Sequence, residues 1–483
     1  MRASWLARNY AGPVSPATPG VDPASRPGRE PPLLPGAVVF VQLADIHFKA
    51  TATADEALLS EVRRELIRDV TRIAPRLPPV KGVLVCGDIA FSGQRLEYEA
   101  ARTWLRDVCK AAGCGEEDVR TVPGNHDVDR SGWNHNHTLQ QIQHAVRQGT
   151  WQGIDAEIHK FTVEDKTAAD LLLRPLTNYN DFALAYACEI NASNLHWEHI
   201  VTLNDGSRLK IRGISSVLVS SPLDNGEDKR LVIGTRQATF TQEDGVQYLL
   251  LCHHPPTWLM DGDEVEERIR DRVRVQLFGH KHRQRIDRIN DAIRLTAGAV
   301  FPEQREPNWV PRYNVLAIAI VGTGAARQMR VTVLPRIWKE EERSFGPDAS
   351  TEGAHYREWE FPIEGWTSPQ AKATSQAATT PLAAEAASPA AGESRPECQR
   401  VNTMDPLRRL AYRFLSLSFE KRLLVAQSLG LLDIDDRDVG ETERGRRFFA
   451  RAQERGLLSA LWKEVEAQHG SADLVNPFDG SNP

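Results

Sequence analysis

Residues 38–47 read VVFVQLADIH, an apolar run that ends in two polar side chains. A nearly continuous apolar run of this length is typical of a strand buried within a sheet. Beyond it the pattern alternates, with helices expected at 54–73 and 94–111 and strands at 82–86 and 119–122. This βαβαβ alternation predicts a largely parallel sheet with right-handed crossovers.

The mixed pattern continues to about residue 361. A long insertion is expected at 131–236, which begins polar and helical and becomes strand-like around the hairpin signal Asn204-Asp205-Gly206. Further strands are expected at 248–252, 275–278, 293–296, 314–320 and 329–334. The later strands predict a second, partly antiparallel sheet. The insertion is where a substrate-selecting element is expected.

Length and composition divide the 483 residues into several units. Residues 1–36 hold eight prolines and no hydrophobic periodicity, so we expect a disordered tail and not an export signal. An α/β domain is expected at 37–361, followed by a flexible linker at 368–399 that is rich in Ala, Ser, Thr and Pro. A small helical domain is expected at 401–470, with a tail at 471–483.

The C-terminal unit has the spacing of short amphipathic helices. Ser418 is expected to cap the second helix and Gly430 to end it, and Gly456 divides two more that end near Gly470. One interpretation is a bundle that docks on the α/β domain and stabilises it. The other is a tethered adaptor that moves independently and recruits a partner protein through helix–helix contacts.

Composition excludes several classes of protein. Hydrophobic residues make up 41% and charged residues 26%, which excludes a wholly disordered chain. No run reaches the roughly 18 apolar residues of a membrane helix, so we expect a soluble protein without a membrane partner. The net charge of −6 gives no general attraction for nucleic acid. Six cysteines without Cys-x-x-Cys spacing indicate reduced thiols, and hence a cytoplasmic location.

Side chains that can bind metal follow five of the predicted strands. They are Asp45 and His47, then Asp88, then Asn125 with His126 and Asp127, then His253 with His254, and finally His280 with His282. In open α/β sheets, active sites form beyond the carboxyl ends of the strands, so these segments are expected to form a metal cage. Oxygen and imidazole ligands without thiolate suit Mn²⁺, Fe or Zn²⁺.

These segments match, in order, the five motif blocks of one superfamily. The blocks are Asp45-Ile46-His47, Gly87-Asp88 with Gly93, Gly124-Asn125-His126-Asp127, His253, and Gly279-His280-Lys281-His282. Over residues 37–361 the chain therefore resembles the calcineurin-like metallophosphoesterases. The resemblance implies an α/β fold, a four-layer αββα sandwich, here followed by a small all-α C-terminal domain. It also implies a dinuclear centre of two divalent metal ions, Mn, Fe or Zn, with Mn favoured.

The resemblance also implies a role for each residue of the blocks. Asp45, His47 and His282 would bind the first metal, Asp88 would bridge the two, and Asn125, His253 and His280 would bind the second. His126 would lie beside the phosphate as an acid or an electrostatic stabiliser, with Asp127 orienting it. His253 and His254 compete for one ligand position. His253 is favoured as the ligand, because family members with one histidine at this position follow it with a different residue and then proline. His254 would then be a candidate to contact the substrate.

The implied reaction is phosphoester hydrolysis, in which a hydroxide that bridges the metals attacks phosphorus. Protein Ser/Thr phosphatases of the superfamily carry an Asp-Arg pair before the last glycine of the second block, where this chain has Phe91-Ser92. The block is more similar to the cyclic-nucleotide phosphodiesterase and repair-exonuclease-like branches, which favours a phosphodiester of nucleotide or nucleic-acid type.

Two further interpretations concern the partners of this site. Residues 268–294 hold nine Lys or Arg against three acidic residues, and could form either a mixed-charge surface or a groove for a polyanion, with Arg283 and Arg285 nearest the metals. The C-terminal unit is similar to adaptor domains of prokaryotic conflict-system effectors, which implies a DNA or RNA nuclease recruited by a protein partner as one alternative. A non-catalytic protein that senses a nucleotide or a partner is the other.

Overall fold

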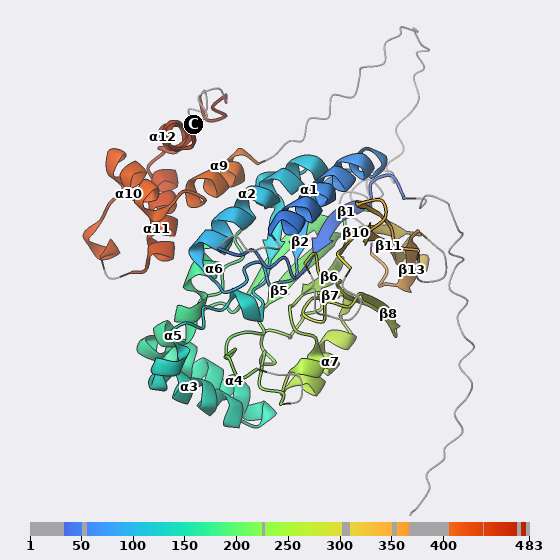
Figure 1. Cartoon of the computed structure of the whole chain (residues 1–483), viewed down its shortest axis with the longest axis horizontal. Coiled ribbons are helices and arrows are strands. Elements are labelled where there is room, and N and C mark those ends of the chain that lie inside the picture. Colours follow the sequence, from blue (N-terminus) through green and yellow to red (C-terminus); the bar gives the residue numbers. More distant parts are fainter. Residues whose placement is uncertain are drawn as a thin grey trace, which may run out of the picture.

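The computed structural model of the chain describes residues 33–50, 56–224, 228–301, 310–349, 355–366, 405–437, 439–470 and 475–479. The predicted linker at 368–399 lies outside these ranges, as do most of the predicted N-terminal tail and part of the C-terminal one. The chain forms two stacked sheets flanked by helices, with a helical unit at one end (Figure 1).

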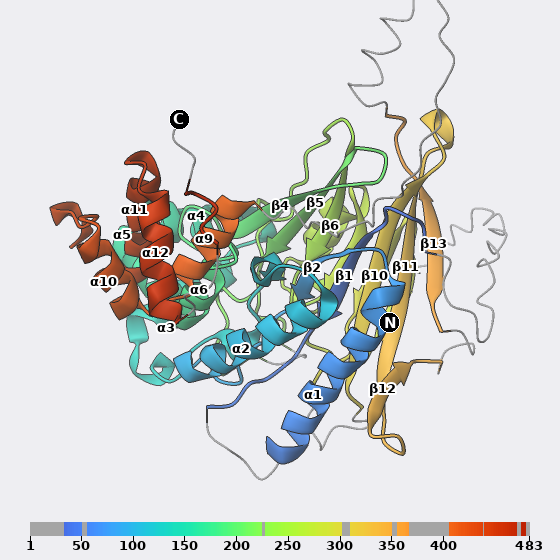
Figure 2. The ribbon, with the colours of Figure 1, turned by 90° about the horizontal axis from the view of Figure 1, so that it is seen from above.

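The first sheet has seven strands. Its order is β12-β11-β10-β1-β2-β3, with β13 also paired to β11. The bounds are β1 Val38–Leu43, β2 Val80–Val85, β3 Val119–Thr121, β10 Arg312–Val321, β11 Gln328–Lys339, β12 Ser344–Pro347 and β13 Arg357–Pro362. Strands β1, β2 and β3 are parallel, whereas β10 runs antiparallel to β1 (Figure 2).

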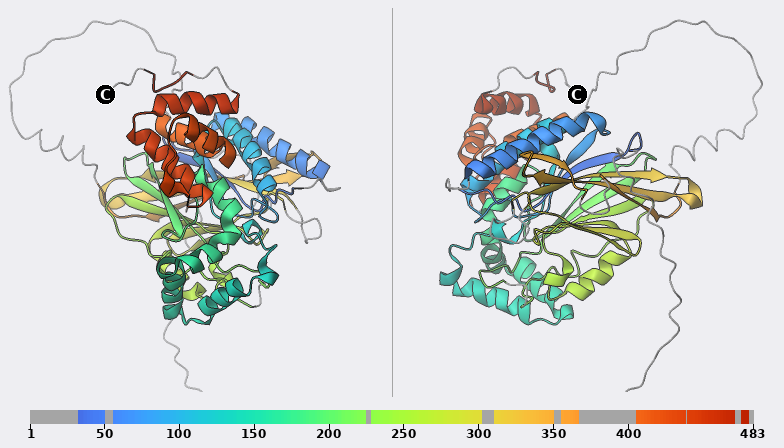
Figure 3. Two further views of the ribbon diagram at one scale, coloured as in Figure 1. Left: turned by 90° about the vertical axis from the view of Figure 1, so that its left-hand side faces the viewer. Right: turned by 45° about the vertical axis from the view of Figure 1, so that its right-hand side comes forward.

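The second sheet has six strands in the order β4-β5-β6-β7-β9-β8. The bounds are β4 His196–Thr202, β5 Arg208–Ile214, β6 Val246–Leu251, β7 Val273–Phe278, β8 Arg285–Ile289 and β9 Ala292–Thr296. The four inner strands are parallel, and the edge strands β4 and β8 are antiparallel to their neighbours. The two sheets face each other across the main core (Figure 3, right).

The division of strands between the sheets differs from the prediction. Strands β10 and β11 were expected in the second sheet, but they extend the first sheet beside β1. All the central residues of β10 are buried, as in a strand covered on both faces. Hydrophobic periodicity predicts that such a strand exists, but its partner is chosen by packing between residues far apart in sequence.

Helices form the outer layers of the sandwich. Helices α1, Glu56–Ile73, and α2, Arg95–Ala112, lie over the first sheet (Figure 1). Helix α1 buries Leu59, Val62, Leu66 and Val70, whose spacing of three and four residues places them on one face. Helix α7, Gly262–Arg270, packs Val265 and Ile269 into a second core beside the other sheet. Among the described helices, none is long and apolar enough to cross a membrane.

The segment predicted as an insertion at 131–236 has two different parts. Helices α3 His137–Gln148, α4 Trp151–His159, α5 Lys166–Leu173 and α6 Thr177–Leu184 precede the sheet strands. The first three share a small core that includes Val146, Ile154 and Leu172. The later part forms β4 and β5, which belong to the second sheet. The helical part therefore lies outside the two sheets, and Leu218, Val219 and Val232, which follow β5, pack into the same small core.

The C-terminal unit is a bundle of four helices docked on α2 and α6 (Figure 3, left). Its helices are α9 Pro406–Leu415, α10 Phe419–Ser428, α11 Glu441–Glu454 and α12 Leu458–His469. Ser418 caps α10, as expected. Among the described residues, three ion pairs cross the interface, namely Arg408 with Asp118, Arg422 with Asp181 and Arg446 with Glu189. The unit thus takes the docked arrangement that one of the two interpretations predicts.

The ion pair between Arg422 and Asp181 predicts unequal effects for its two partners. Arg422 is fully buried, and its Nε and Nη1 have no hydrogen-bond partner among the described residues. Asp181→Ala leaves this cation without its carboxylate and should cost about 1–3 kcal/mol, less than for a fully buried pair because Asp181 is partly exposed. Arg422→Met removes the charge as well and should change stability by less than about 1 kcal/mol.

Urea denaturation of both variants tests this prediction. The expected result is a lower midpoint for Asp181→Ala and a midpoint near that of the wild type for Arg422→Met. Equal midpoints for Asp181→Ala and the wild type would show that the ion pair does not hold the C-terminal unit in place.

Candidate metal centre

The predicted ligands come from the carboxyl ends of strands in both sheets. From the first sheet, Asp45 and His47 follow β1, Asp88 follows β2, and Asn125 and His126 follow β3. From the second sheet, His253 and His254 follow β6, and His280 and His282 follow β7. The site therefore lies where the ends of the two sheets meet.

The backbone is strained where it presents these side chains. Eight non-glycine residues of the described chain have positive φ, and five of them are predicted ligands: Asp45, His47, Asp88, His280 and His282. Such conformations cost about 1–3 kcal/mol each and persist only where the surroundings enforce them. Here the amides of Ile46 and His47 both donate to the Asp88 carbonyl, at 2.8 and 3.0 Å, which holds the two loops together.

Glycines allow these loops to approach each other closely. A Cβ on Gly124 would lie 2.1 Å from Oδ1 of Asp88, and a Cβ on Gly279 would lie 2.6 Å from the Cys86 carbonyl oxygen. No side chain larger than hydrogen fits at either distance. The motif glycines are thus required by the packing of the loops that carry the ligands.

One group of potential ligands is Asp45, His47, Asp88 and His282, whose ligand atoms lie within 4.8 Å of one another. His282 Nε2 lies 3.3 Å from Asp45 Oδ1, and His47 Nε2 lies 3.4 Å from Asp88 Oδ2. Asp45 Oδ2 is buried without a hydrogen-bond partner in the described chain. A buried carboxylate oxygen without a donor fits a cation, so this group suits a metal ion.

A second group comprises His253, His254 and His280. Nε2 of His253 lies 3.2 Å from Asp88 Oδ2 and 3.2 Å from Asn125 Oδ1, whereas Nε2 of His254 lies 3.1 Å from Asn125 Oδ1. Of the two competing histidines, His253 is the one in contact with Asp88. Asp88 Oδ2 therefore contacts one histidine of each group.

Backbone carbonyl groups orient the histidine rings. His47 Nδ1 contacts the Phe301 carbonyl at 3.2 Å, and His253 Nδ1 contacts the Cys86 carbonyl at 2.7 Å. His254 Nδ1 contacts Ser216 Oγ at 2.8 Å. A hydrogen bond at Nδ1 leaves Nε2 for a metal, as in known metal sites. None of these three partners belongs to a sequence motif, because two act through the main chain and Ser216 has no characteristic spacing.

His126 lies beside the ligand groups and belongs to neither. Its ring Nδ1 contacts the Phe91 carbonyl at 2.7 Å, and its backbone N–H donates to Asp88 Oδ1 at 2.8 Å. Its ring centroid is 4.8 Å from that of His47. This position suits the predicted contact with a phosphate group held between the metals.

Asp127 does not have the role predicted for it. Its buried carboxylate accepts hydrogen bonds from the amides of Ala90 and Gly124, both at 2.9 Å, and from the Tyr98 hydroxyl at 3.0 Å. The His126 ring is instead oriented by Phe91. Asp127 therefore fixes the second and third loops together, because its short side chain is turned toward the backbone and away from the imidazole.

Comparison with known proteins agrees with this geometry. Residues 38–284, just over half of the chain, match the family model of the calcineurin-like phosphoesterases. The chain belongs to the calcineurin-like phosphoesterase family. Residues 406–467 match the model of the GTPase-associated adaptor domain.

Individual relatives of this phosphoesterase are distant. The uncharacterized metallophosphoesterase-like protein YydB of Bacillus subtilis is 30% identical over 93 residues, which are 19% of this chain and 18% of that protein. Vps29 of Chaetomium thermophilum matches with a TM-score of 0.27 and 10% identity, over 68% of this chain and 99% of Vps29. GAP50 of Plasmodium matches with a TM-score of 0.34 and 12% identity, over 74% of this chain and 99% of GAP50. Likeness at this level carries no argument about activity.

Electrostatics in the phosphoesterase site favour the metal-binding forms of two groups. Burial raises the pKa of Asp88, but His253 and His47 outweigh it and hold that pKa well below the ordinary value. Burial lowers the pKa of His280 to about 3. At neutral pH, Asp88 is ionised and His280 is neutral, as metal ligands must be. Burial also lowers the pKa of His253, but Asp88 raises it to about 9, because the buried carboxylate needs a positive charge nearby.

The basic segment 268–294 does not form one groove beside the phosphoesterase site. Arg268 and Arg272 line a separate hollow together with acidic residues, and Arg294 forms an ion pair with Glu266 at 2.6 Å. Arg283 follows His282 directly and Arg285 begins β8, and both are exposed. The charges diverge because α7 and the strands β7, β8 and β9 direct them to different faces. Arg283 and Arg285 as substrate contacts remain a prediction.

Proposed function

We propose that this chain is a hydrolase of phosphoesters that uses two divalent metal ions and acts on phosphodiesters. The observation that carries the proposal is the position of Asp88 Oδ2, 3.4 Å from His47 Nε2 in one ligand group and 3.2 Å from His253 Nε2 in the other. A carboxylate shared in this way would hold two metal ions close enough to clamp one phosphoryl group.

The donor set assigns the ligands of each ion. Asp45, His47 and His282 would hold one ion with Asp88, and Asn125, His253 and His280 would hold the other. Two divalent ions bound there would supply activation of water and neutralisation of phosphoryl oxygens. The oxygen and imidazole donors suit Mn²⁺, Fe or Zn²⁺, of which the family resemblance favours manganese.

His126 contributes a proton or a positive charge at the substrate. Its Nδ1–H donates to the Phe91 carbonyl, so a proton at Nε2 exists only in the imidazolium form. Burial lowers the pKa of His126, so this form depends on the negative charge of a phosphoryl group beside it. An imidazolium beside the phosphoryl group stabilises the negative charge that develops on oxygen in the transition state and can protonate the leaving oxygen.

The lining of the site supports a diester over a monoester. Phe91 and Ser92 take the positions of the charged Asp-Arg pair of protein phosphatases. The Phe91 ring lies 5.3 Å from that of His126, and the Ser92 hydroxyl donates to Glu97 Oε1 at 2.8 Å. The side chains of Phe91 and Ser92 carry no charge of their own for the second negative charge of a monoester, and the cation at this wall is Lys49, whose Nζ lies 4.5 Å from the Phe91 ring centroid. An apolar ring here suits the esterified side of a diester.

Hydrolysis of bis-p-nitrophenyl phosphate and p-nitrophenyl phosphate with added Mn²⁺ tests the proposal. We expect kcat/KM for the diester to exceed that for the monoester by tenfold or more. A preference for the monoester would contradict the diester assignment. Absence of turnover in protein that holds two metals would favour the alternative of a binding protein without catalysis.

Removal of the metals should destabilise the protein. Each metal present at a hundred times its dissociation constant adds about 2.7 kcal/mol to the free energy of unfolding. A chelator should therefore lower Tm by about 5–15 °C. Differential scanning fluorimetry with EDTA, followed by Mn²⁺ in excess, measures the loss and its recovery. Asp88→Ala is the matched control, and its response to EDTA should be much smaller. An unchanged wild-type Tm would argue against metal binding at these residues.

A second function, recruitment of a partner, is favoured by the C-terminal match. The matched model describes a GTPase-associated adaptor domain, so we propose that residues 401–470 bind a GTPase-type protein. Leu424, Leu432 and Ile434 of this unit are large apolar side chains exposed by 44–70%. Pull-down with the full chain and with Ile434→Asp tests the proposal, and an unchanged set of partners would count against a role for this surface.

A cytoplasmic location is part of the proposal. The five described cysteines are all free thiols. Burial raises the pKa of both Cys86 and Cys252 to about 12, so they are unreactive core residues. Free buried thiols fit a reducing compartment.

A further inference from the structure

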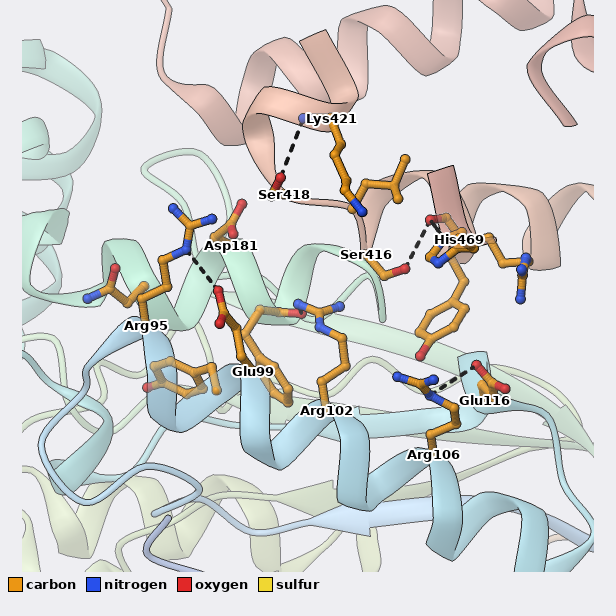
Figure 4. A pocket seen from close by; sticks show the side chains of 16 residues that line it. Arg95, Glu99, Arg102, Arg106, Glu116, Asp181, Ser416, Ser418, Lys421 and His469 are labelled. Carbon is orange, nitrogen blue, oxygen red and sulfur yellow. Dashed lines mark hydrogen bonds and ion pairs between the residues drawn. The ribbon is translucent and has the colours of Figure 1, made fainter. Parts of the chain in front are cut away.

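A cavity of about 480 Å³ lies between the C-terminal unit and the sandwich. Figure 4 shows α2 and α6 on one side of it, and the α9–α10 turn with the end of α12 on the other. Five cationic side chains line it, namely Arg95, Arg102 and Arg106 from α2, and Arg413 and Lys421 from the C-terminal unit. We call it the interdomain cavity.

The acidic residues of the interdomain cavity already have cationic partners. Glu99 pairs with Arg95 at 3.1 Å, and Glu116 pairs with Arg106 at 3.9 Å. Asp181 pairs with Arg422, which reaches it from α10. Arg413 is likewise engaged, by Glu466 outside the cavity. Arg102 and Lys421 remain, one from each wall.

Among the described residues, Arg102 and Lys421 donate hydrogen bonds to carbonyl groups, and the Arg102 guanidinium also lies over the rings of Phe182 and Tyr186, 5.2 and 5.8 Å from their centroids. Arg102 Nη2 donates to the Phe182 carbonyl at 3.4 Å, and Lys421 Nζ donates to the Gln468 carbonyl at 3.0 Å. Arg102 Nη1 is buried with no hydrogen-bond partner among the described residues. A buried guanidinium donor without an acceptor is unfavourable, and a native structure rarely keeps one without a reason. The cavity thus has two cations without a carboxylate partner in the described chain.

Other donors in the cavity wall suit the same chemistry. Ser416 and Ser418 line the cavity, and Ser418 is the N-cap of α10. The first amides of a helix and its positive dipole end attract anions, above all phosphate groups. The helix terminus from one wall and the Arg102 guanidinium from the other therefore present donors to one space.

We infer that the interdomain cavity binds a small phosphate-bearing anion, either free phosphate or a nucleotide. Its volume falls in the range of ligand sites, about 300–1,000 Å³. Arg102 and Lys421 supply the countercharge, and the Ser418 hydroxyl at the start of α10 supplies a further donor, whereas the Ser416 hydroxyl already donates to the Arg413 carbonyl at 2.9 Å. Because the donors come from both walls, the ligand ties the C-terminal unit to the sandwich.

The cavity wall also contacts the loops of the metal centre. Tyr98 lines the cavity and donates its hydroxyl proton to Asp127 Oδ1 at 3.0 Å, and Asp127 fixes the loops that carry Asp88 and Asn125. Asn178 lines the cavity as well and donates to the Gly93 carbonyl at 2.8 Å. A ligand that shifts α2 or α6 therefore acts on the catalytic loops through two direct hydrogen bonds. This regulatory part rests on the proposed function, whereas the binding does not.

Isothermal titration of the full-length, metal-loaded protein tests the binding. The probes are inorganic phosphate and AMP, each added to the wild type, Arg102→Gln and Lys421→Gln. We expect two sites in the wild type, one of them the metal centre, and a loss of at least tenfold in affinity at one site in both variants. The matched control is Lys463→Gln, since Lys463 is an exposed lysine of the same unit, paired with Asp479 at 3.3 Å, and should bind as the wild type does.

The outcomes separate the parts of the inference. Tighter binding of AMP assigns the cavity to a nucleotide, and equal binding assigns it to phosphate. Identical binding by the wild type and both variants overturns the cavity site, whether or not the chain is an enzyme. When hydrolysis of a diester is measured, added phosphate should change kcat in the wild type but only KM in Arg102→Gln and Lys421→Gln. If phosphate changes only KM in the wild type as well, the regulatory link is overturned, and the binding site is unaffected by that result.

Discussion

Asp88→Ala is expected to lower kcat/KM for a diester about a thousandfold or more, because a dinuclear centre supplies several kcal/mol of transition-state stabilisation. Oδ2 of Asp88 contacts one histidine of each ligand group, and Oδ1 accepts the His126 amide at 2.8 Å. The substitution thus removes the shared ligand and loosens the third loop. Metal analysis should show fewer than two ions per chain.

The fold should survive this change, because the strands and their cores do not depend on Asp88. Circular dichroism checks this, and Asp170→Ala, an exposed aspartate on α5, is the control for loss of a carboxylate. Activity within tenfold of the wild type, in protein that still holds two metals, would contradict the bridging role.

His126→Ala is expected to lower kcat by about 10²–10⁴, the usual contribution of a positioned acid or base, with two metals retained. Its ring contacts the Phe91 carbonyl and lies next to His47, outside both ligand groups. KM should change little, because the lost interaction forms mainly in the transition state.

The control for this variant is His135→Ala, an exposed histidine in the loop that follows the third motif block. It should keep wild-type kcat. If the metal content of His126→Ala falls together with kcat, His126 belongs to the ligand set and the assignment of a substrate contact is wrong.

The local sequence pattern predicted the helices and strands that lead into the candidate site. The helix expected at 94–111 is α2 at Arg95–Ala112, and the strand expected at 119–122 is β3 at Val119–Thr121. Periodicity and capping residues are local signals, so boundaries agree to within one or two residues. Strand β8 was not predicted, because its residues are mostly exposed and charged and a strand at a sheet edge needs no apolar alternation.

The candidate site also has one part that the sequence predicted and another that it could not predict. The spacing of motif residues predicted which side chains meet, because the carboxyl ends of strands meet at one place. The carbonyl groups of Cys86, Phe91 and Phe301 could not be predicted, since every residue has a carbonyl group and only the fold directs it. The contact of Asp127 with backbone amides was not predicted, because the family resemblance implied the His126 ring as its partner.

The left-handed backbone at five predicted ligands has a consequence for engineering. Strain of about 1–3 kcal/mol at each position is energy that the sandwich must supply in order to hold the site. Selection for heat resistance alone should therefore favour glycine or asparagine at His47 or His280, where the backbone strain would be relieved and a candidate metal ligand would be lost. Thermostability and the geometry of the candidate metal centre are opposed in this molecule at identifiable residues, and a stabilised variant must gain its stability elsewhere.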